Sequence, residues 1–167
     1  EQCCHTGGSL AFDGHGNLFL STGDNSNPFA NGYAPIDERP GRMPWDAQKS
    51  SASTNDLRGK ILRIHPEPDG SYTSPTGTLS PPGTPETRPD RNPYRISIDA
   101  HTGVLYWGDV GPDASVDSVD RGPAGQDEVG RAARPGNYGW PHFVGDNKAY
   151  RDIDYATMRI GPPFDPE

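Results

Sequence analysis

The feature that most constrains this chain is a strand-turn-strand unit that occurs twice. Residues 9–13 and 18–24 are short apolar runs on either side of a turn, Gly14-His15-Gly16-Asn17. Residues 95–99 and 104–109 repeat the design around a turn that ends at Gly103. Alternating runs bounded by Gly, Asp and Asn are typical of β-hairpins. The repetition predicts an all-β architecture built from copies of one hairpin unit.

The spacing of the two units indicates what kind of repeat this is. Asp13 and Asp99 hold equivalent positions 86 residues apart (99 − 13), about twice the 40 to 50 residues of an ordinary propeller blade. A further strand is expected at residues 60–64, after a polar loop over about residues 25–56. Loops of this length inside a compact domain are usually functional or disordered. We interpret the interval as one blade enlarged by a functional loop.

Composition agrees with short strands and long loops. Only 31% of the 167 residues are hydrophobic, while 21 are Gly and 19 are Pro. Such a chain has little material for amphipathic helices, and none is evident. No apolar run approaches the roughly 20 residues of a membrane-spanning helix, so no membrane span is expected.

The net charge of the chain limits the classes of function that it can have. The formal net charge is −8, and the acidic residues gather in the expected loops. Nucleic-acid binding requires a basic surface, so it is excluded as the main function. Loop carboxylates and carbonyls are ligands of the kind that Ca²⁺ prefers, although acidic loops that are simply solvated would look the same.

The ends and the cysteines add two expectations. Neither end carries an initiator Met or a signal peptide, so residues 1–167 are interpreted as a partial domain of a larger chain. The only cysteines, Cys3 and Cys4, are adjacent. They can join only in a strained eight-membered ring, which would stiffen the backbone locally rather than staple the fold.

Seven short motifs then occur in an order that is characteristic of one family. They are CHTGGSL at residues 4–10, GDN at 23–25, LRGKILRI at 57–64, RNP at 91–93, GDVGP at 108–112, DEV at 127–129 and GNYGWP at 136–141. In this the chain resembles the glucose/sorbosone dehydrogenases, soluble sugar dehydrogenases that use pyrroloquinoline quinone. The resemblance is strongest to a bacterial branch with paired cysteines before the histidine. It implies about two blades, with long loops, of a six-bladed β-propeller in a secreted or periplasmic protein.

The resemblance also implies roles for individual residues. His5 matches the general base of the quinone-dependent members, and imidazole suits that work because it titrates near neutral pH. Arg91 and Asn92 match the pair that contacts the cofactor, where a guanidinium would stabilise negative charge on a reduced quinone. Asn25 holds a position at which relatives place a polar cofactor contact. The other histidines have no comparable context and are interpreted as ordinary loop residues.

A metal site is implied as well. Gly111 and Pro112 match the loop whose backbone carbonyls hold the active-site calcium in the family, although a Gly-Pro turn with no metal would look the same. Asp127 and Glu128 follow that loop as further candidate ligands. Tyr138 and Trp140 are expected to pack as core anchors. One departure is notable: Arg88-Pro89-Asp90 runs directly into Arg91, where relatives carry a strand, so a blade strand is expected to be missing.

The function implied by the resemblance is oxidation of an aldose, with hydride passed to pyrroloquinoline quinone and electrons then given to an external acceptor. The complete protein is expected to be the enzyme, and these 167 residues alone to be inactive. The alternative is a secreted, non-catalytic propeller that binds carbohydrate or protein partners, because fold does not determine function.

Overall fold

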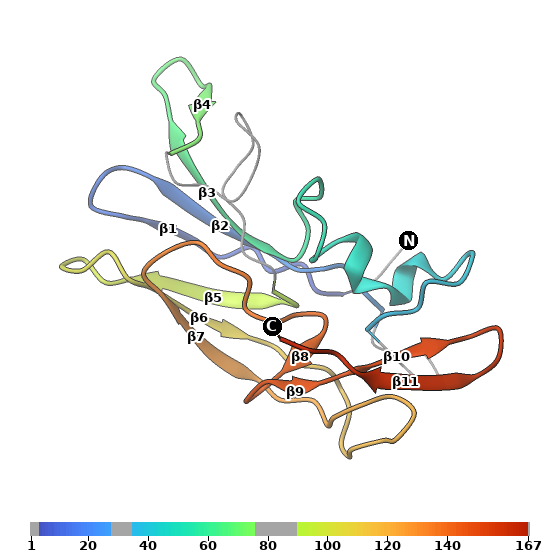
Figure 1. Ribbon diagram of the computed structural model, residues 1–167. Helices are drawn as coiled ribbons and strands as arrows, with labels where there is room; N and C mark the ends of the chain where they lie inside the picture. Colours follow the sequence, from blue (N-terminus) through green and yellow to red (C-terminus); the bar gives the residue numbers. More distant parts are fainter. Residues whose placement is uncertain (1–3, 28–34, 76–89, 167) are drawn as a thin grey trace.

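The computed structural model describes residues 4–27, 35–75 and 90–166, and within these it contains two main antiparallel sheets (Figure 1). The first sheet has the order β1-β2-β3-β4. Its strands are β1 (Leu10–Phe12), β2 (Leu18–Thr22), β3 (Lys60–Pro66) and β4 (Tyr72–Thr73). The hairpin predicted near residues 9–24 and the strand predicted at 60–64 are therefore confirmed.

The second sheet repeats this arrangement with three strands in the order β5-β6-β7. They are β5 (Pro93–Ile98), β6 (Leu105–Asp109) and β7 (Glu128–Ala132). Two small hairpins follow, formed by β8 (Phe143–Val144) with β9 (Lys148–Ala149) and by β10 (Arg151–Asp154) with β11 (Arg159–Pro163). The second predicted hairpin is confirmed, whereas β7 to β11 were not anticipated.

Helix is almost absent from the part of the chain described. It is limited to two single 3-10 turns in the long loop before β3, η1 (Met43–Trp45) and η2 (Ala47–Lys49). The all-β prediction is thus confirmed. No helix among the described residues has the length and apolar character needed to cross a membrane. The position of the expected missing strand falls on residues 76–89, which lie outside the described ranges, so that expectation stays a prediction.

The two hairpin units share one turn chemistry. In the first turn, Asp13 accepts hydrogen bonds from the backbone of His15 at 2.8 Å and of Asn17 at 2.9 Å. In the second turn, Asp99 accepts them from the backbone of His101 at 3.1 Å and of Thr102 at 2.7 Å. An aspartate that binds the backbone two residues ahead is a frequent turn initiator. The matched positions therefore close both hairpins in the same way.

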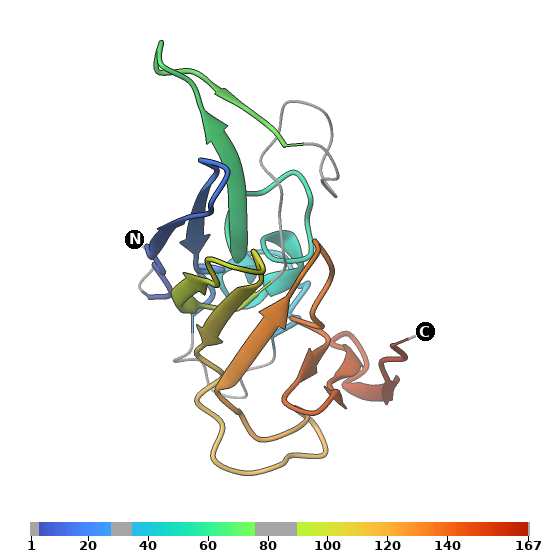
Figure 2. The same cartoon turned by 90° about the vertical axis from the view of Figure 1, so that its left-hand side faces the viewer.

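The main core lies between the two sheets, which contact each other through β1, β2 and β5 (Figure 2). It is formed by Phe19, Ile61, Ile96, Leu105, Trp107 and Ala132. β7 joins this core because Gly130 leaves room for the Trp107 ring: a Cβ at Gly130 would lie 2.1 Å from Trp107 Cε2. A run as short as EVGRA, with a central glycine, gives little strand signal by itself.

A second core fastens the C-terminal hairpins to the long loop. Its members are Ala47 of η2, Trp140, Val144 and Tyr150, all buried. Trp140 and Tyr150 pack edge to face with ring centroids 6.1 Å apart. The expectation that Trp140 is a core anchor is confirmed.

Candidate functional site

The site is centred on His5, which precedes β1, and Asp24, which follows β2. His5 Nδ1 lies 2.6 Å from Asp24 Oδ1, and the exposed fractions of the two side chains are 6% and 0%. A hydrogen bond at Nδ1 leaves Nε2 as the ring nitrogen able to take a proton from a ligand. The pair thus has the arrangement of a base and the carboxylate that orients it.

Asp24 is held by donors from two distant parts of the chain. Ser26 donates from its backbone at 2.8 Å to Oδ1 and from its hydroxyl at 2.9 and 2.8 Å to Oδ1 and Oδ2. The Trp140 indole N–H donates to Oδ2 at 3.1 Å, across 116 residues of sequence. Because a buried carboxylate needs such donors, this shell keeps Asp24 in one orientation beside His5.

The backbone around His5 has unusual φ angles and is in close contact with the end of β2. Cys4 and His5 have φ of +88° and +56°, the left-handed region that side chains other than glycine rarely adopt. Cys4 is disulfide-bonded, and Cys3 lies outside the described residues. A Cβ at Gly23 would lie 1.7 Å from the His5 carbonyl oxygen, so only glycine fits there. The Gly23-Asp24 pair therefore brings β2 directly against the His5 backbone.

Arg91 and Asn92 connect the second sheet to this pair. Asp109, at the end of β6, accepts from the backbone N–H of Arg91 at 3.0 Å and of Asn92 at 2.6 Å. The Asp24 N–H donates to the Arg91 carbonyl at 2.7 Å, and Gly7 N–H donates to Asn92 Oδ1 at 3.1 Å. The predicted site residues of the two sheets thus belong to one hydrogen-bond network.

The Arg91 side chain points into the interior. It is 2% exposed, its Nη1 donates to the Val110 carbonyl at 2.6 Å, and its Cζ lies 6.0 Å from the Trp140 ring centroid. Nε and Nη2 have no hydrogen-bond partner among the described residues. Buried guanidinium N–H groups without acceptors cost free energy. A ligand or a water molecule that accepted hydrogen bonds from them would remove that cost.

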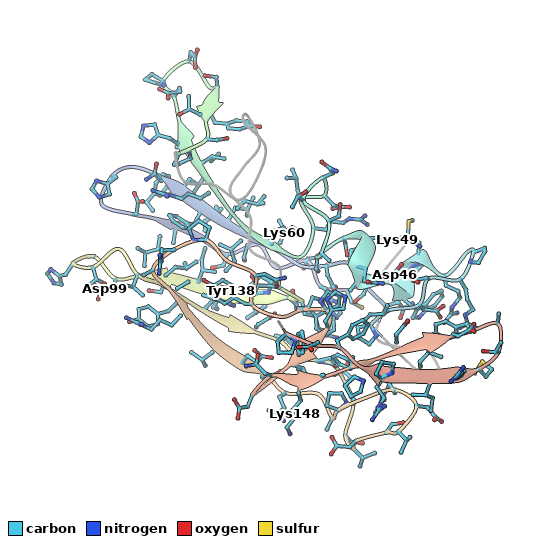
Figure 3. The ribbon with its side chains drawn as sticks, in the orientation of Figure 1. Asp46, Lys49, Lys60, Asp99, Tyr138 and Lys148 are labelled. Atoms are coloured by element: carbon cyan, nitrogen blue, oxygen red, sulfur yellow. The ribbon has the colours of Figure 1, made fainter. Side chains whose placement is uncertain are left out.

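Arg91 lines a cavity of about 100 Å³ that also borders residues of β6 and β7 in the second sheet. The polar part of its lining is formed by Asp90, Arg91, Asp109, Gln126 and Glu128, and the remainder by Trp107, Gly111, Pro112, Gly130, Tyr138, Trp140, Phe143 and Val144. The Tyr138 ring, labelled in Figure 3, packs edge to face on Trp107 with centroids 5.1 Å apart.

Two of the three carboxyl groups in the cavity lining, those of Asp109 and Glu128, are poorly solvated. Burial raises the pKa of Asp109 to about 7, and the charge of Glu128 adds to this effect against the backbone hydrogen bonds from Arg91 and Asn92. Burial also raises the pKa of Glu128, whose Oε1 accepts from Gly145 N–H at 2.6 Å. A cation in this cavity would favour the ionised forms of both.

The predicted metal ligands are partly engaged with one another. Gly111 N–H donates to exposed Asp127 at 2.9 Å, and the Pro112 carbonyl accepts from Ala114 N–H at 2.8 Å. Within the described ranges no cluster of three or more His, Cys, Asp or Glu side chains could hold a metal ion. The cavity lining offers side-chain oxygens from Asp90, Asp109, Gln126 and Glu128, and with Asp127 and loop carbonyls nearby these are hard donors of the type that suits Ca²⁺.

The remaining predicted residues and histidines are readily placed. Asn25 is half-buried beside Asp24, with φ of +59°. His65 Nδ1 lies 3.1 Å from Asn17 Oδ1, and His142 Nε2 lies 3.2 Å from Gln48 Oε1. Burial lowers the pKa of His142. Neither histidine shares the carboxylate environment of His5.

Sequence reasoning missed Asp24, Asp109 and the contact made by Trp140. A usable signal was present, since both hairpins end in Gly-Asp, as Gly23-Asp24 and Gly108-Asp109. In the structure each of these aspartates organises a neighbouring segment. The Trp140 contact had no such signal, because nothing local to residue 140 indicates a partner at residue 24.

Comparison with known proteins extends these observations. The sequence profile of the Glucose / Sorbosone dehydrogenase family matches residues 1–162. Aldose sugar dehydrogenase YliI of Escherichia coli strain K12 is 25% identical over 164 residues, which is 93% of this chain and 32% of the relative.

Two solved structures share the fold. An oxidoreductase (glucose dehydrogenase) of Thermus thermophilus superimposes with a TM-score of 0.55 at 29% identity, over 89% of this chain and 38% of that one. A glucose dehydrogenase superimposes with a TM-score of 0.52 at 25% identity, over 84% and 32%. The chain thus spans about a third of the length of these relatives, and its two sheets are part of a β-propeller. Its motifs, fold and profile match together establish that the chain belongs to the glucose/sorbosone dehydrogenase family.

Proposed function

We propose that the complete protein oxidises an aldose sugar with pyrroloquinoline quinone, and that His5 is the general base. The observation that carries this proposal is the buried His5–Asp24 pair, with 2.6 Å between Nδ1 and Oδ1. Asp24 orients the imidazole and would stabilise the positive charge that it gains with a proton, as in other base-carboxylate pairs. Support comes from the relatives, whose names describe them as aldose sugar and glucose dehydrogenases.

The chemistry divides between the cofactor and the chain. Pyrroloquinoline quinone, when bound, supplies the hydride acceptor. His5 Nε2 takes the proton of the anomeric hydroxyl while the C1–H bond breaks and its electron pair leaves with the hydrogen, so the sugar becomes the lactone. His5 then gives its proton to solvent. An external acceptor would take the two electrons, and the hydrogen that left as hydride would be released as a proton.

Other residues would hold the cofactor and a calcium ion. Arg91 offers two nitrogen atoms, Nε and Nη2, without hydrogen-bond partners in the described structure, and their N–H groups suit the oxygens of a quinone or its carboxylates. Asn92 and Asn25 would flank it. Ca²⁺ would be held by Glu128 and Asp127 together with the Gly111 and Pro112 carbonyls, oxygen ligands of the kind that this ion prefers. We place the protein in a secreted or periplasmic compartment.

The test is reconstitution of the complete protein with quinone and Ca²⁺, followed by dye reduction with a panel of aldoses. His5→Ala should lower kcat by roughly 10² to 10⁴, the usual contribution of a positioned base, and quinone binding should survive. Arg91→Ala should weaken quinone affinity and rate together, because a charge-assisted contact acts in ground and transition states alike.

His15→Ala is the matched control, because His15 lies in an exposed turn of the same hairpin and should change neither property. Full activity in His5→Ala would remove the base assignment. If the wild-type protein oxidised no aldose, the non-catalytic binding propeller would become the better account.

A further inference from the structure

The Asp24 carboxylate receives one donor that does not come from its own neighbourhood. His5 and Ser26 lie in segments that flank the first hairpin, but the Trp140 indole reaches it from the segment between β7 and β8. Trp140 is itself immobilised, since it is 5% exposed and packs against Tyr150, Val144 and Ala47. Its N–H is thus a fixed point to which the carboxylate is tied.

The Trp140 indole and the Ser26 hydroxyl differ in how strongly they restrict the orientation of the Asp24 carboxylate. The Ser26 hydroxyl lies within 2.9 Å of both carboxylate oxygens, so it tolerates rotation of the carboxylate plane. Trp140 Nε1 bonds only to Oδ2, and His5 Nδ1 is paired at 2.6 Å with Oδ1. With one oxygen directed to the indole, the other is directed to the imidazole. The indole donates to Oδ2 and the Ser26 backbone N–H donates to Oδ1 at 2.8 Å, so the two together hold the carboxylate plane in which the His5 ring lies.

We propose that Trp140 is a positioning residue for His5. Its N–H donates to Asp24 Oδ2 and so keeps Oδ1 directed at His5. The His5 Nδ1–H then donates to Oδ1, and Nε2 is left free to take the substrate proton. The proposal rests on the function proposed above for the assignment of His5 as base. It also predicts a physical state of His5, the Nδ1–H tautomer in one ring orientation, which can be observed without any turnover.

The experiment removes the indole N–H from the complete protein. Trp140→Phe keeps an aromatic ring in the core, and β-(3-benzothienyl)alanine at the same position keeps both rings while replacing N–H with sulfur. A hydrogen bond to a charged group is worth about 1.5–3 kcal/mol, so kcat on the best aldose should fall roughly 10- to 100-fold. KM should change little, and kcat is expressed per quinone-loaded protein, because a loosened fold that lowered only the active fraction would also lower the apparent kcat.

The second readout is nitrogen NMR of labelled histidine. In the wild type, His5 should show a protonated Nδ1 with a strongly downfield proton, as expected for an imidazole N–H shared with a carboxylate. Both variants should weaken that proton signal and mix the two tautomers. Trp45→Phe is the matched control, because the Trp45 indole N–H is buried without a hydrogen-bond partner among the described residues; it should leave kcat and the His5 signals unchanged.

The two readouts separate the possible failures. Wild-type kcat and wild-type His5 signals in the folded benzothienyl variant would overturn the positioning role. Altered His5 signals in a protein that oxidises no aldose would support the role of Trp140 and reject the dehydrogenase function. Equal losses in the Trp140 and Trp45 variants would overturn the proposal, since the effect would then follow from replacing either indole and not from the contact with Asp24.

Discussion

At the scale of single residues, the site depends on backbone conformations that its side chains do not favour. Cys4 and His5 have positive φ, and such conformations cost of the order of 1–3 kcal/mol each. They persist because the surroundings over-determine them, through the glycine at position 23, the Asp24 hydrogen bond and the disulfide of Cys4. Strain of this kind is common where a catalytic group must be held in one place.

A residue-scale prediction concerns the acidic cavity. We expect calorimetry on the complete protein to detect Ca²⁺ binding at or below millimolar concentration, the range that weak extracellular calcium modules reach. Glu128→Gln should weaken binding by about tenfold or more, because it removes a carboxylate from the cavity lining. Asp113→Asn is the control, because Asp113 is exposed in the loop between β6 and β7, and it should have no effect. Absence of binding at millimolar Ca²⁺ would remove the metal from the mechanism.

At the scale of elements, the long loop before β3 is held in place by the side chain of Lys60, the first residue of that strand. Its Nζ donates to the carbonyls of Ser50, Ser51 and Arg58 at 2.7–2.9 Å, and the residue is 1% exposed. Figure 3 labels Lys60 together with Lys49 of η2 and Asp46, the residue that caps the start of η2. One ammonium group therefore closes a loop that has little regular structure of its own.

Lys60→Met should lower the free energy of unfolding by about 2–4 kcal/mol, because three buried carbonyls lose their donor. Lys148→Met is the control, since Lys148 lies exposed in β9 and its replacement should stay within about 0.5 kcal/mol of the wild type. Chemical denaturation at pH 7 measures both. Equal effects would show that the Lys60 contacts add no stability.

The same lysine predicts a pH dependence. Burial lowers the pKa of Lys60 from 10.5 to about 8. Between these values the unfolded chain binds the proton more tightly than the folded chain, so stability should rise as pH increases from about 8 to about 10.5. Below about pH 8 both states are protonated and the cost of burying the charge is present in full. Lys60→Met should lack this rise, and unfolding curves across the window would show it.

At the scale of the whole molecule, the first sheet has two apolar faces. One contributes Phe19 and Ile61 to the core shared with the second sheet. On the opposite face the strand register aligns Leu10, Leu20 and Leu62 in one row and Phe12, Leu18 and Ile64 in the next. Leu10 and Phe12 are 60% and 63% exposed in this chain. Contiguous apolar surface of this kind marks an interface, and in a propeller the occupant is the adjoining blade.

Phe12→Lys in the complete protein should therefore destabilise it by roughly 2 kcal/mol or more, since a charge would be buried between blades. Val119→Lys, at a loop position that is 77% exposed, should stay within about 0.5 kcal/mol of the wild type. Thermal or chemical unfolding compares the two. A neutral Phe12→Lys would show that this face is open to solvent in the complete protein.

Local sequence was sufficient for the elements whose signals are local. Alternating apolar runs and the turn aspartates Asp13 and Asp99 predicted both hairpins, because side-chain period and turn chemistry act over a few residues. The ordered motifs identified the family, and they also assigned His5, Arg91 and Asn92 to one site, an assignment that stays a prediction. These predictions required no knowledge of which strands meet.

What only the tertiary structure decided involves partners far apart in the chain. β7 forms because Gly130 makes room for Trp107, which the run EVGRA alone does not reveal. Arg91 is buried because Val110 and Trp140 surround it, a placement that its motif alone does not reveal. The orientation of His5 depends on a carboxylate 19 residues away and an indole bonded to that carboxylate across 116 residues. Such contacts arise only when the sheets pack, because hydrogen bonds between distant segments have no local pattern to mark them in the sequence.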